Sequence, residues 1–150
     1  MRSYEEDLRV ETAASFSVHD ITADVRRVVR ESGIISGTVT VSSMHTTCAV
    51  CVNEFEERLL DDMQRFFLKL APAEHPWKHN DLHLRDNIPP DEPKNAHAHL
   101  IALMLSNGQT LAVRNGEPVL GRYQSVLLAE MDGPRRRTVA VQVLGASAET

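Results

Sequence analysis

Alternating and continuous apolar runs predict β-strands along much of this chain. Residues 37–43 alternate β-branched and polar side chains, residues 48–52 are apolar, and residues 138–144 carry alternating valines. Further strands are expected over residues 8–16, 110–114, 118–121 and 124–130. The pair Asn115-Gly116, which separates two of them, is typical of a two-residue type I′ hairpin turn.

Two segments before residue 72 carry apolar side chains at three- and four-residue steps, which predicts amphipathic helices. The first follows Asp20, a good N-cap, and ends at Gly33, a good C-cap. The second opens at Asn53-Glu54 and ends before Pro72. Its apolar stripe, which we assign to the protein core, consists of Phe55, Leu59, Met63, Phe66 and Leu70.

A third helix is predicted over residues 96–106, with Asn95 as its N-cap and Asn107-Gly108 as its end. Its expected anchors in the core are Leu100, Ile101, Leu103 and Met104. The segment before it, residues 71–94, has no clear period and is rich in proline, but it contains Trp77 and three histidines. We interpret it as an ordered active-site loop, because a long connection inside a compact domain is usually functional or disordered.

The order of these elements predicts an α+β fold with an antiparallel, β-sandwich-like core and two to three helices. A parallel doubly wound sheet would need strands and helices in regular alternation, which the strand-rich last third lacks. We expect one domain over residues 1–150, because this length is typical of a single domain and no internal repeat is visible.

The charge and composition exclude several classes of partner. A net charge of −5 and a pI near 5.8 argue against non-specific nucleic-acid binding. No apolar run is long enough to span a membrane, and residues 1–7 lack the apolar core of a signal peptide, so we predict a cytoplasmic protein. Cys48 and Cys51 lie in an apolar strand and are interpreted as small buried hydrophobic residues pointing to opposite faces.

Histidines near carboxylates are the strongest chemical signal. The chain has seven histidines, of which five fall between His75 and His99. Such clusters are typical of metal sites or of acid–base sites. His97 and His99 are two apart, about 200° around a helix, so they face one ligand only if one precedes the regular helix. No His-Glu-x-x-His or zinc-finger spacing is present, and the metal interpretation stays open beside the acid–base one.

The same region could instead bind phosphate. A helix that begins after Asn95 offers free backbone N–H groups and the positive end of its dipole. Four arginines could supply countercharge from the strands: Arg114, Arg122, Arg135 and Arg137. A Ser–His hydrolase around His45 is a weaker alternative, because no Gly-x-Ser-x-Gly motif occurs.

Taken together, six motifs resemble one family. They are His45-Thr-Thr-Cys-Ala, Asn53-Glu54, Trp77-Lys-His79, Asn95-Ala-His-Ala-His99, Leu120-Gly-Arg-Tyr-Gln124 and Glu130-Met-Asp-Gly-Pro-Arg-Arg-Arg137. Their order and spacing resemble the YjbQ family, also called UPF0047, over about residues 8–145. Its members are described as secondary thiamine-phosphate synthases. The resemblance implies an α+β protein that assembles as a homotrimer, with a polar site between protomers.

The resemblance also implies site residues and a reaction. His45, His79 and His99 match the characteristic histidines and would hold a divalent metal ion, zinc or magnesium. Catalytic roles fall to His45, Glu54, His97 and Glu130, and substrate binding to Asn95, Arg135 and Arg137. The implied transferase joins a hydroxymethylpyrimidine diphosphate to a thiazole phosphate and releases pyrophosphate. Two alternatives remain open, a non-catalytic metal- or metabolite-binding trimer and a metal-dependent hydrolase.

Overall fold

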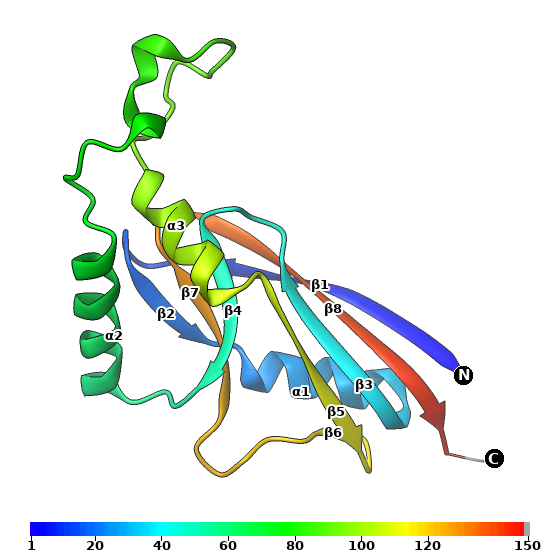
Figure 1. Cartoon of the computed structure of the whole chain (residues 1–150). Helices are drawn as coiled ribbons and strands as arrows, with labels where there is room; N and C mark the ends of the chain where they lie inside the picture. The colour runs from blue at the N-terminus through cyan, green and yellow to red at the C-terminus, as the bar shows by residue number, and fades with distance from the viewer. Residues whose placement is uncertain (149–150) are drawn as a thin grey trace.

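The computed structural model describes residues 1–148 and shows an α+β fold built on two antiparallel sheets (Figure 1). One sheet has five strands in the order β1-β8-β3-β5-β6, and the other has three in the order β2-β7-β4. All pairings between these strands are antiparallel, as predicted. The strands are β1 (Arg2–Glu11), β2 (Ser17–Asp20), β3 (Ile34–Ser43), β4 (Cys48–Asn53), β5 (Gly108–Arg114), β6 (Glu117–Pro118), β7 (Ser125–Glu130) and β8 (Arg136–Ser147).

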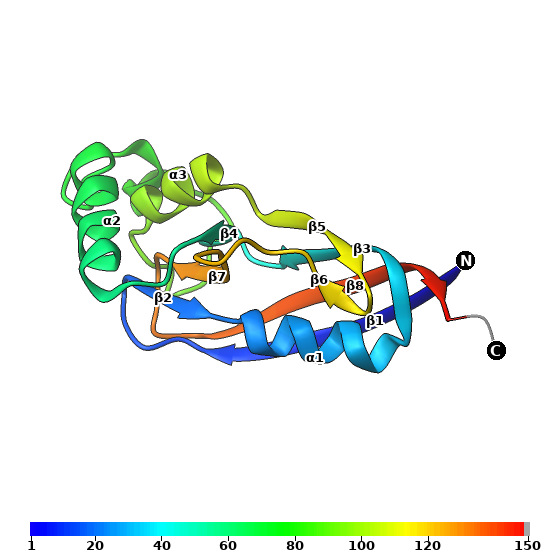
Figure 2. The ribbon, with the colours of Figure 1, turned by 90° about the horizontal axis from the view of Figure 1, so that it is seen from below.

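The three-stranded sheet is a middle layer with different partners on its two faces. In β4, Cys48 and Val50 face the main core, which also contains α1 (Thr22–Ser32) and the apolar residues of the larger sheet. The alternate residue Ala49 faces a second cluster, which includes Ile101 of α3 (Ala96–Leu105). Period-two alternation therefore places α1 and the larger sheet on one side, and α2 (Glu57–Leu70) and α3 on the other (Figure 2).

Most predicted elements are confirmed, with shifted ends. The N-cap of α1 is Ile21 rather than the predicted Asp20, although Asp20 Oδ1 accepts a hydrogen bond from the backbone N–H of Thr22 at 3.0 Å. Gly33 ends the helix at φ 68°, as predicted. Asn115 and Gly116 both have positive φ, 53° and 75°, as a type I′ turn requires. The strand expected over residues 8–16 is wrong in extent, because β1 already ends at Glu11 and β2 begins at Ser17.

The apolar stripe predicted for the second helix does not lie in the core of this chain. The helix begins at Glu57 rather than at Asn53-Glu54, and none of its residues is buried. Phe66 is 61% exposed and Leu70 is 55% exposed. Helical periodicity correctly predicted an apolar face, but the rest of the chain covers only part of it. Phe67 and Leu68 pack against the second cluster, whereas Phe66 and Leu70 stay exposed.

The expected anchors of α3 are only partly right. Ile101 is buried, but Leu103 and Met104 are exposed. The other buried residues of this helix are Ala96, Ala98 and Ala102. Small side chains let the helix lie close to the alanines of β4 and β7, so alanines rather than leucines form this contact.

The segment between α2 and α3 rises away from the sheets (Figure 1). It contains two short 3₁₀ helices, Lys78–Asn80 and Leu82–Leu84. Arg85 ties the segment together, because its guanidinium donates to the carbonyl of His79 at 3.1 Å and to Glu92 at 2.9 Å. Within residues 1–148, no helix has the length and apolar character that crossing a membrane requires.

Candidate functional site

Several segments meet at one edge of the three-stranded sheet. Cys48 pairs with Glu130 at the end of the β4–β7 ladder, so the loop before β4 and the turn after β7 leave the sheet together. The backbone N–H of Met131 donates to the carbonyl of Thr47 at 3.2 Å, which joins this loop to this turn. The start of α3 reaches the same edge, because Asn95 Nδ2 donates to Asp132 Oδ2 at 2.8 Å.

These segments line an open cavity of about 400 Å³, which we call the polar cavity. Its lining residues are Met44, His45, Thr46, Thr47, Glu92, Pro93, Asn95, His99, Asp132, Arg135 and Arg137. Five residues singled out from the sequence are thus brought to one place: His45, Asn95, His99, Arg135 and Arg137. They come from positions up to 92 residues apart, since 137 − 45 = 92.

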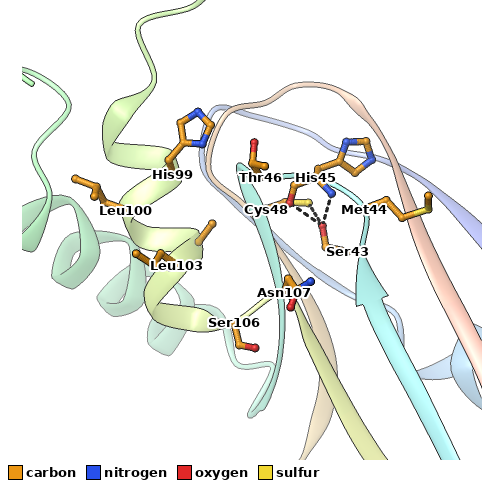
Figure 3. A pocket seen from close by; sticks show the side chains of 11 residues that line it. Ser43, Met44, His45, Thr46, Cys48, His99, Leu100, Leu103, Ser106 and Asn107 are labelled. Carbon is orange, nitrogen blue, oxygen red and sulfur yellow. Dashed lines mark hydrogen bonds between the residues drawn. The ribbon is translucent and has the colours of Figure 1, made fainter. Parts of the chain in front are cut away.

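A second hollow of about 850 Å³ adjoins the polar cavity, and we call it the outer hollow. His45 and His99 line both spaces, so they lie at the junction. The outer hollow continues along α3 past Leu100 and Leu103 toward Asn107 (Figure 3). One end of this combined site is therefore charged and the other is largely apolar.

Glu130 and Arg137 form a buried ion pair behind the polar cavity. Arg137 Nε donates to Glu130 Oε2 and Arg137 Nη2 donates to Oε1, both at 2.6 Å. Glu130 also accepts from Thr12 Oγ1 at 2.9 Å and from the backbone N–H of Asp132 at 2.8 Å. Burial by itself raises the pKa of Glu130, but these hydrogen bonds outweigh it and hold the pKa below its usual value. Glu130, predicted as catalytic, does not line the cavity and instead orients Arg137 and the turn.

Asp132 is a site residue that the sequence analysis missed. Its carboxylate accepts from Asn95 and also from Arg135 Nη2 at 3.0 Å, while its carbonyl accepts from Arg135 Nε at 2.8 Å. From the sequence, Asp132 was only part of a turn and of the motif from Glu130 to Arg137, and no local pattern reveals that this turn faces a helix start. Asp132 therefore sets the orientation of both Asn95 and Arg135 in the cavity.

The start of α3 differs from the prediction in its cap. The helix begins after Asn95 as expected, but the side chain of Asn95 does not cap it. Instead, Asn80 Oδ1 accepts from the backbone N–H of Ala96 at 3.1 Å. Asn95 Oδ1 is buried and accepts no hydrogen bond from residues 1–148. The segment that contains His79 is thus fixed to the helix start.

The histidines of the cavity are held in the neutral form. Burial lowers the pKa of His45, and the positive charges of Arg137 and Arg135 lower it further, against the opposing effect of Glu130. Burial also lowers the pKa of His99, as does His79. The rings of His79 and His99 meet edge to face, with centroids 4.8 Å apart and an interplanar angle of 76°. Neutral imidazoles can both accept and donate hydrogen bonds.

Two predicted catalytic residues lie outside this cluster. Glu54 follows Asn53, at the opposite end of β4 from Cys48 and the cavity. His97 is in α3, but it lines neither the polar cavity nor the outer hollow. Burial lowers its pKa, while Asp132 and Glu74 act to raise it. Helical geometry thus separates His97 from His99, as their spacing implied.

The predicted metal set does not fit a metal ion within one chain. Among residues 1–148, no three or more His, Cys, Asp or Glu side chains converge as a metal site would require. His45 Nε2, an expected ligand atom, already accepts the backbone N–H of Thr138 at 2.9 Å. His45 and His99 line the polar cavity, whereas His79 does not line it and has a buried Nε2 with no hydrogen-bond partner among residues 1–148.

Comparisons with known proteins agree with this fold. The family model described as UPF0047 protein YjbQ-like matches residues 6–146. A UPF0047 protein from Methanothermobacter thermautotrophicus is 38% identical over 145 residues, which cover 97% of this chain and 94% of that protein. One from Archaeoglobus fulgidus is 38% identical over 138 residues, covering 92% and 99%. The crystal structure of a YbjQ-like protein of unknown function from Sulfolobus solfataricus P2 superposes with a TM-score of 0.87 at 36% identity, covering 97% and 99%.

Proposed function

We propose the following function for this chain, which belongs to the YjbQ-like UPF0047 family: it binds a phosphorylated small molecule in the polar cavity and transfers the organic group of that molecule. One observation carries the proposal. His45, Asn95, His99 and Arg135 line a single cavity of about 400 Å³ at the N-terminus of α3. Guanidinium, imidazole N–H and a helix N-terminus are the groups that bind phosphate in proteins.

The specific reaction that we propose follows the family resemblance. A hydroxymethylpyrimidine diphosphate is joined to a thiazole phosphate, and the C–O bond to the diphosphate breaks. Pyrophosphate leaves with both electrons of that bond, so negative charge grows on an oxygen as the reaction proceeds. Preorganised donors aimed at such an oxygen lower the barrier. In this proposal Arg135 and His45, which line the polar cavity, donate to that oxygen, and the outer hollow takes the organic group.

The charges in the polar cavity are closely balanced. Arg135 is paired with Asp132, and Glu92 is paired with Arg85. Arg137 is neutralised by Glu130. An anion entering the cavity therefore shares the Arg135 guanidinium with Asp132, which makes Arg135, 44% exposed, the most adaptable cation of the site. Because the histidines do not fit a metal within one chain, we assign no step to a metal ion.

We propose that the protein acts as a homotrimer, in line with the resemblance. Large apolar residues are exposed on α2 and α3, including Phe66, Leu70 and Leu103. Large apolar side chains exposed on the face of a helix are a common feature of interaction sites. A partner on this side would also lie beside the outer hollow, which Leu103 lines.

The proposal is tested by the reaction itself and by one matched pair of variants. Purified protein is incubated with the two precursors, and thiamine phosphate is measured against a heat-inactivated control. Arg135→Met should lower product formation about tenfold or more, because it removes the most exposed cation of the cavity. Arg136→Met is the control, since Arg136 pairs with Glu11 on the surface and does not line the cavity.

Each other outcome identifies a different function. Pyrophosphate binding without product in the presence of both precursors would support a non-catalytic binding protein. Release of phosphate without the thiazole acceptor would support a hydrolase. Neither binding nor turnover, or equal loss in both arginine variants, would overturn the proposal.

A further inference from the structure

The backbone amide of Thr138 points at the ring of His45. The last pair of the β3–β8 ladder joins Ser43 to Val139, so Thr138 lies one residue beyond it. Its N–H and carbonyl face the β3 side but find no strand partner there. The loop after β3 supplies a hydrogen-bond partner for each group. The Met44 N–H donates to the Thr138 carbonyl at 3.3 Å, and His45 Nε2 accepts the Thr138 N–H at 2.9 Å.

This hydrogen bond decides which nitrogen of His45 carries the proton. A backbone N–H can only donate, so Nε2 must offer a lone pair. In a neutral imidazole the proton then sits on Nδ1. His45 Nδ1 has no hydrogen-bond partner among residues 1–148, and it is not one of the buried unpaired atoms in that part of the chain. The N–H at Nδ1 is therefore open to a ligand.

We propose that Thr138 is a positioning residue that locks His45 as the Nδ1–H tautomer, so that His45 acts as a hydrogen-bond donor to a phosphate or diphosphate oxygen. This inference rests on the proposed function for the identity of the ligand. In this role His45 is neither a base nor a ligand through Nε2, since either would break the bond to Thr138.

His99 is then the histidine of the cavity that can accept a proton. Of the two histidines that line the polar cavity, His45 has one ring nitrogen engaged, whereas the ring of His99 makes no hydrogen bond with residues 1–148. Its ring packs edge to face with the ring of His79. The two cavity histidines therefore have different and complementary roles: a fixed donor and an open acceptor.

The tautomer can be read directly in the whole protein by long-range ¹H–¹⁵N NMR of ¹⁵N-histidine-labelled material. We expect the Nδ1–H pattern for His45, and protonation at Nε2 would overturn the proposal. Thr138→Pro removes the amide hydrogen and should shift His45 toward the Nε2–H form. Thr138→Val keeps the amide and should leave the tautomer unchanged. Should the proline variant not fold, the wild-type spectrum still decides.

A pair of isosteres tests the donor role separately, with inorganic pyrophosphate as the probe in calorimetry. His45→Asn keeps an N–H near the position of Nδ1, whereas His45→Gln places its amide near Nε2. We expect pyrophosphate to bind the glutamine variant about tenfold more weakly than the asparagine variant. Equal affinities would overturn the donor role. An Nδ1–H tautomer in wild-type protein that binds no pyrophosphate would overturn the proposed function but not the lock by Thr138.

Discussion

Glu130 and Arg137 face each other across two hydrogen bonds of 2.6 Å and are almost completely buried. The side chain of Glu130 is 0% exposed and that of Arg137 is 5% exposed. Thr12 and the backbone of Asp132 supply the remaining donors to Glu130, and Thr47 Oγ1 accepts from Arg137 at 2.8 Å. This pair links β7, β8 and the end of β1 directly behind the polar cavity, so it fixes the positions of the segments that line the site.

Removing the charge of Glu130 should unfold the protein more easily. Glu130→Gln leaves the Arg137 guanidinium buried without its counterion, which costs about 3–5 kcal/mol in comparable buried pairs. Urea denaturation at pH 7 measures the loss. Glu11→Gln is the matched control, because Glu11 also pairs with an arginine, Arg136, but that pair is 69–70% exposed. Similar decreases in the free energy of unfolding in the two variants would show that the buried pair contributes no more to stability than the exposed pair.

The carboxylate of Glu130 should also make the free energy of unfolding depend on pH. The pKa of Glu130 is held below the usual value of 4.5, so the folded state binds this proton less readily than the unfolded state does. A lowered pKa in the folded state stabilises the protein above the unfolded pKa, and this contribution is lost as pH falls through the folded pKa. We expect the free energy of unfolding to fall below about pH 4.5, with a shallower fall in Glu130→Gln. An equally steep fall in the variant would assign the effect to other carboxylates.

The sequence was a good guide wherever a local pattern was enough. Period-two alternation placed β3 and β8, a continuous apolar run placed β4, and the Asn115-Gly116 turn was recognisable from two residues. Periodicity could not say what covers an apolar helix face, so the stripe containing Phe66 was wrongly assigned to the core of one chain. The site shows the same limit. His45, Asn95, His99, Arg135 and Arg137 were expected to matter, but Asp132 depends on a contact across 37 residues that no local motif encodes.

Asp132 should limit the affinity of the polar cavity for anions. Asp132→Asn removes a negative charge beside Arg135, so inorganic pyrophosphate should bind more tightly, by up to about tenfold. Titration calorimetry compares this variant with Asp86→Asn, which changes the same charge on the exposed segment between α2 and α3. Weaker binding in Asp132→Asn would mean instead that Asp132 acts mainly by orienting Asn95 and Arg135.

The metal content of the purified protein distinguishes a metal-binding role of the histidines from a hydrogen-bonding role. Because no three metal-binding side chains converge within residues 1–148, we expect less than one equivalent of zinc or another transition metal per chain in freshly purified protein. Elemental analysis is made on the wild type and on His99→Ala side by side. Stoichiometric metal in the wild type that is lost in the variant would contradict this expectation. It would then require ligands from a neighbouring subunit.

The exposed face of α2 should hold protomers together. Phe66 and Leu70 lie four residues apart, so they share one side of the helix, whereas Arg65 is directed away from that side. Phe66→Gln replaces an aromatic contact by a polar side chain, and we expect it to lower the mass measured by light scattering toward that of a single chain. Arg65→Gln is the control, because it introduces the same residue at the adjacent position and removes only an exposed ion pair with Asp61. An unchanged mass in Phe66→Gln, or an equal loss in Arg65→Gln, would show that association does not use this face.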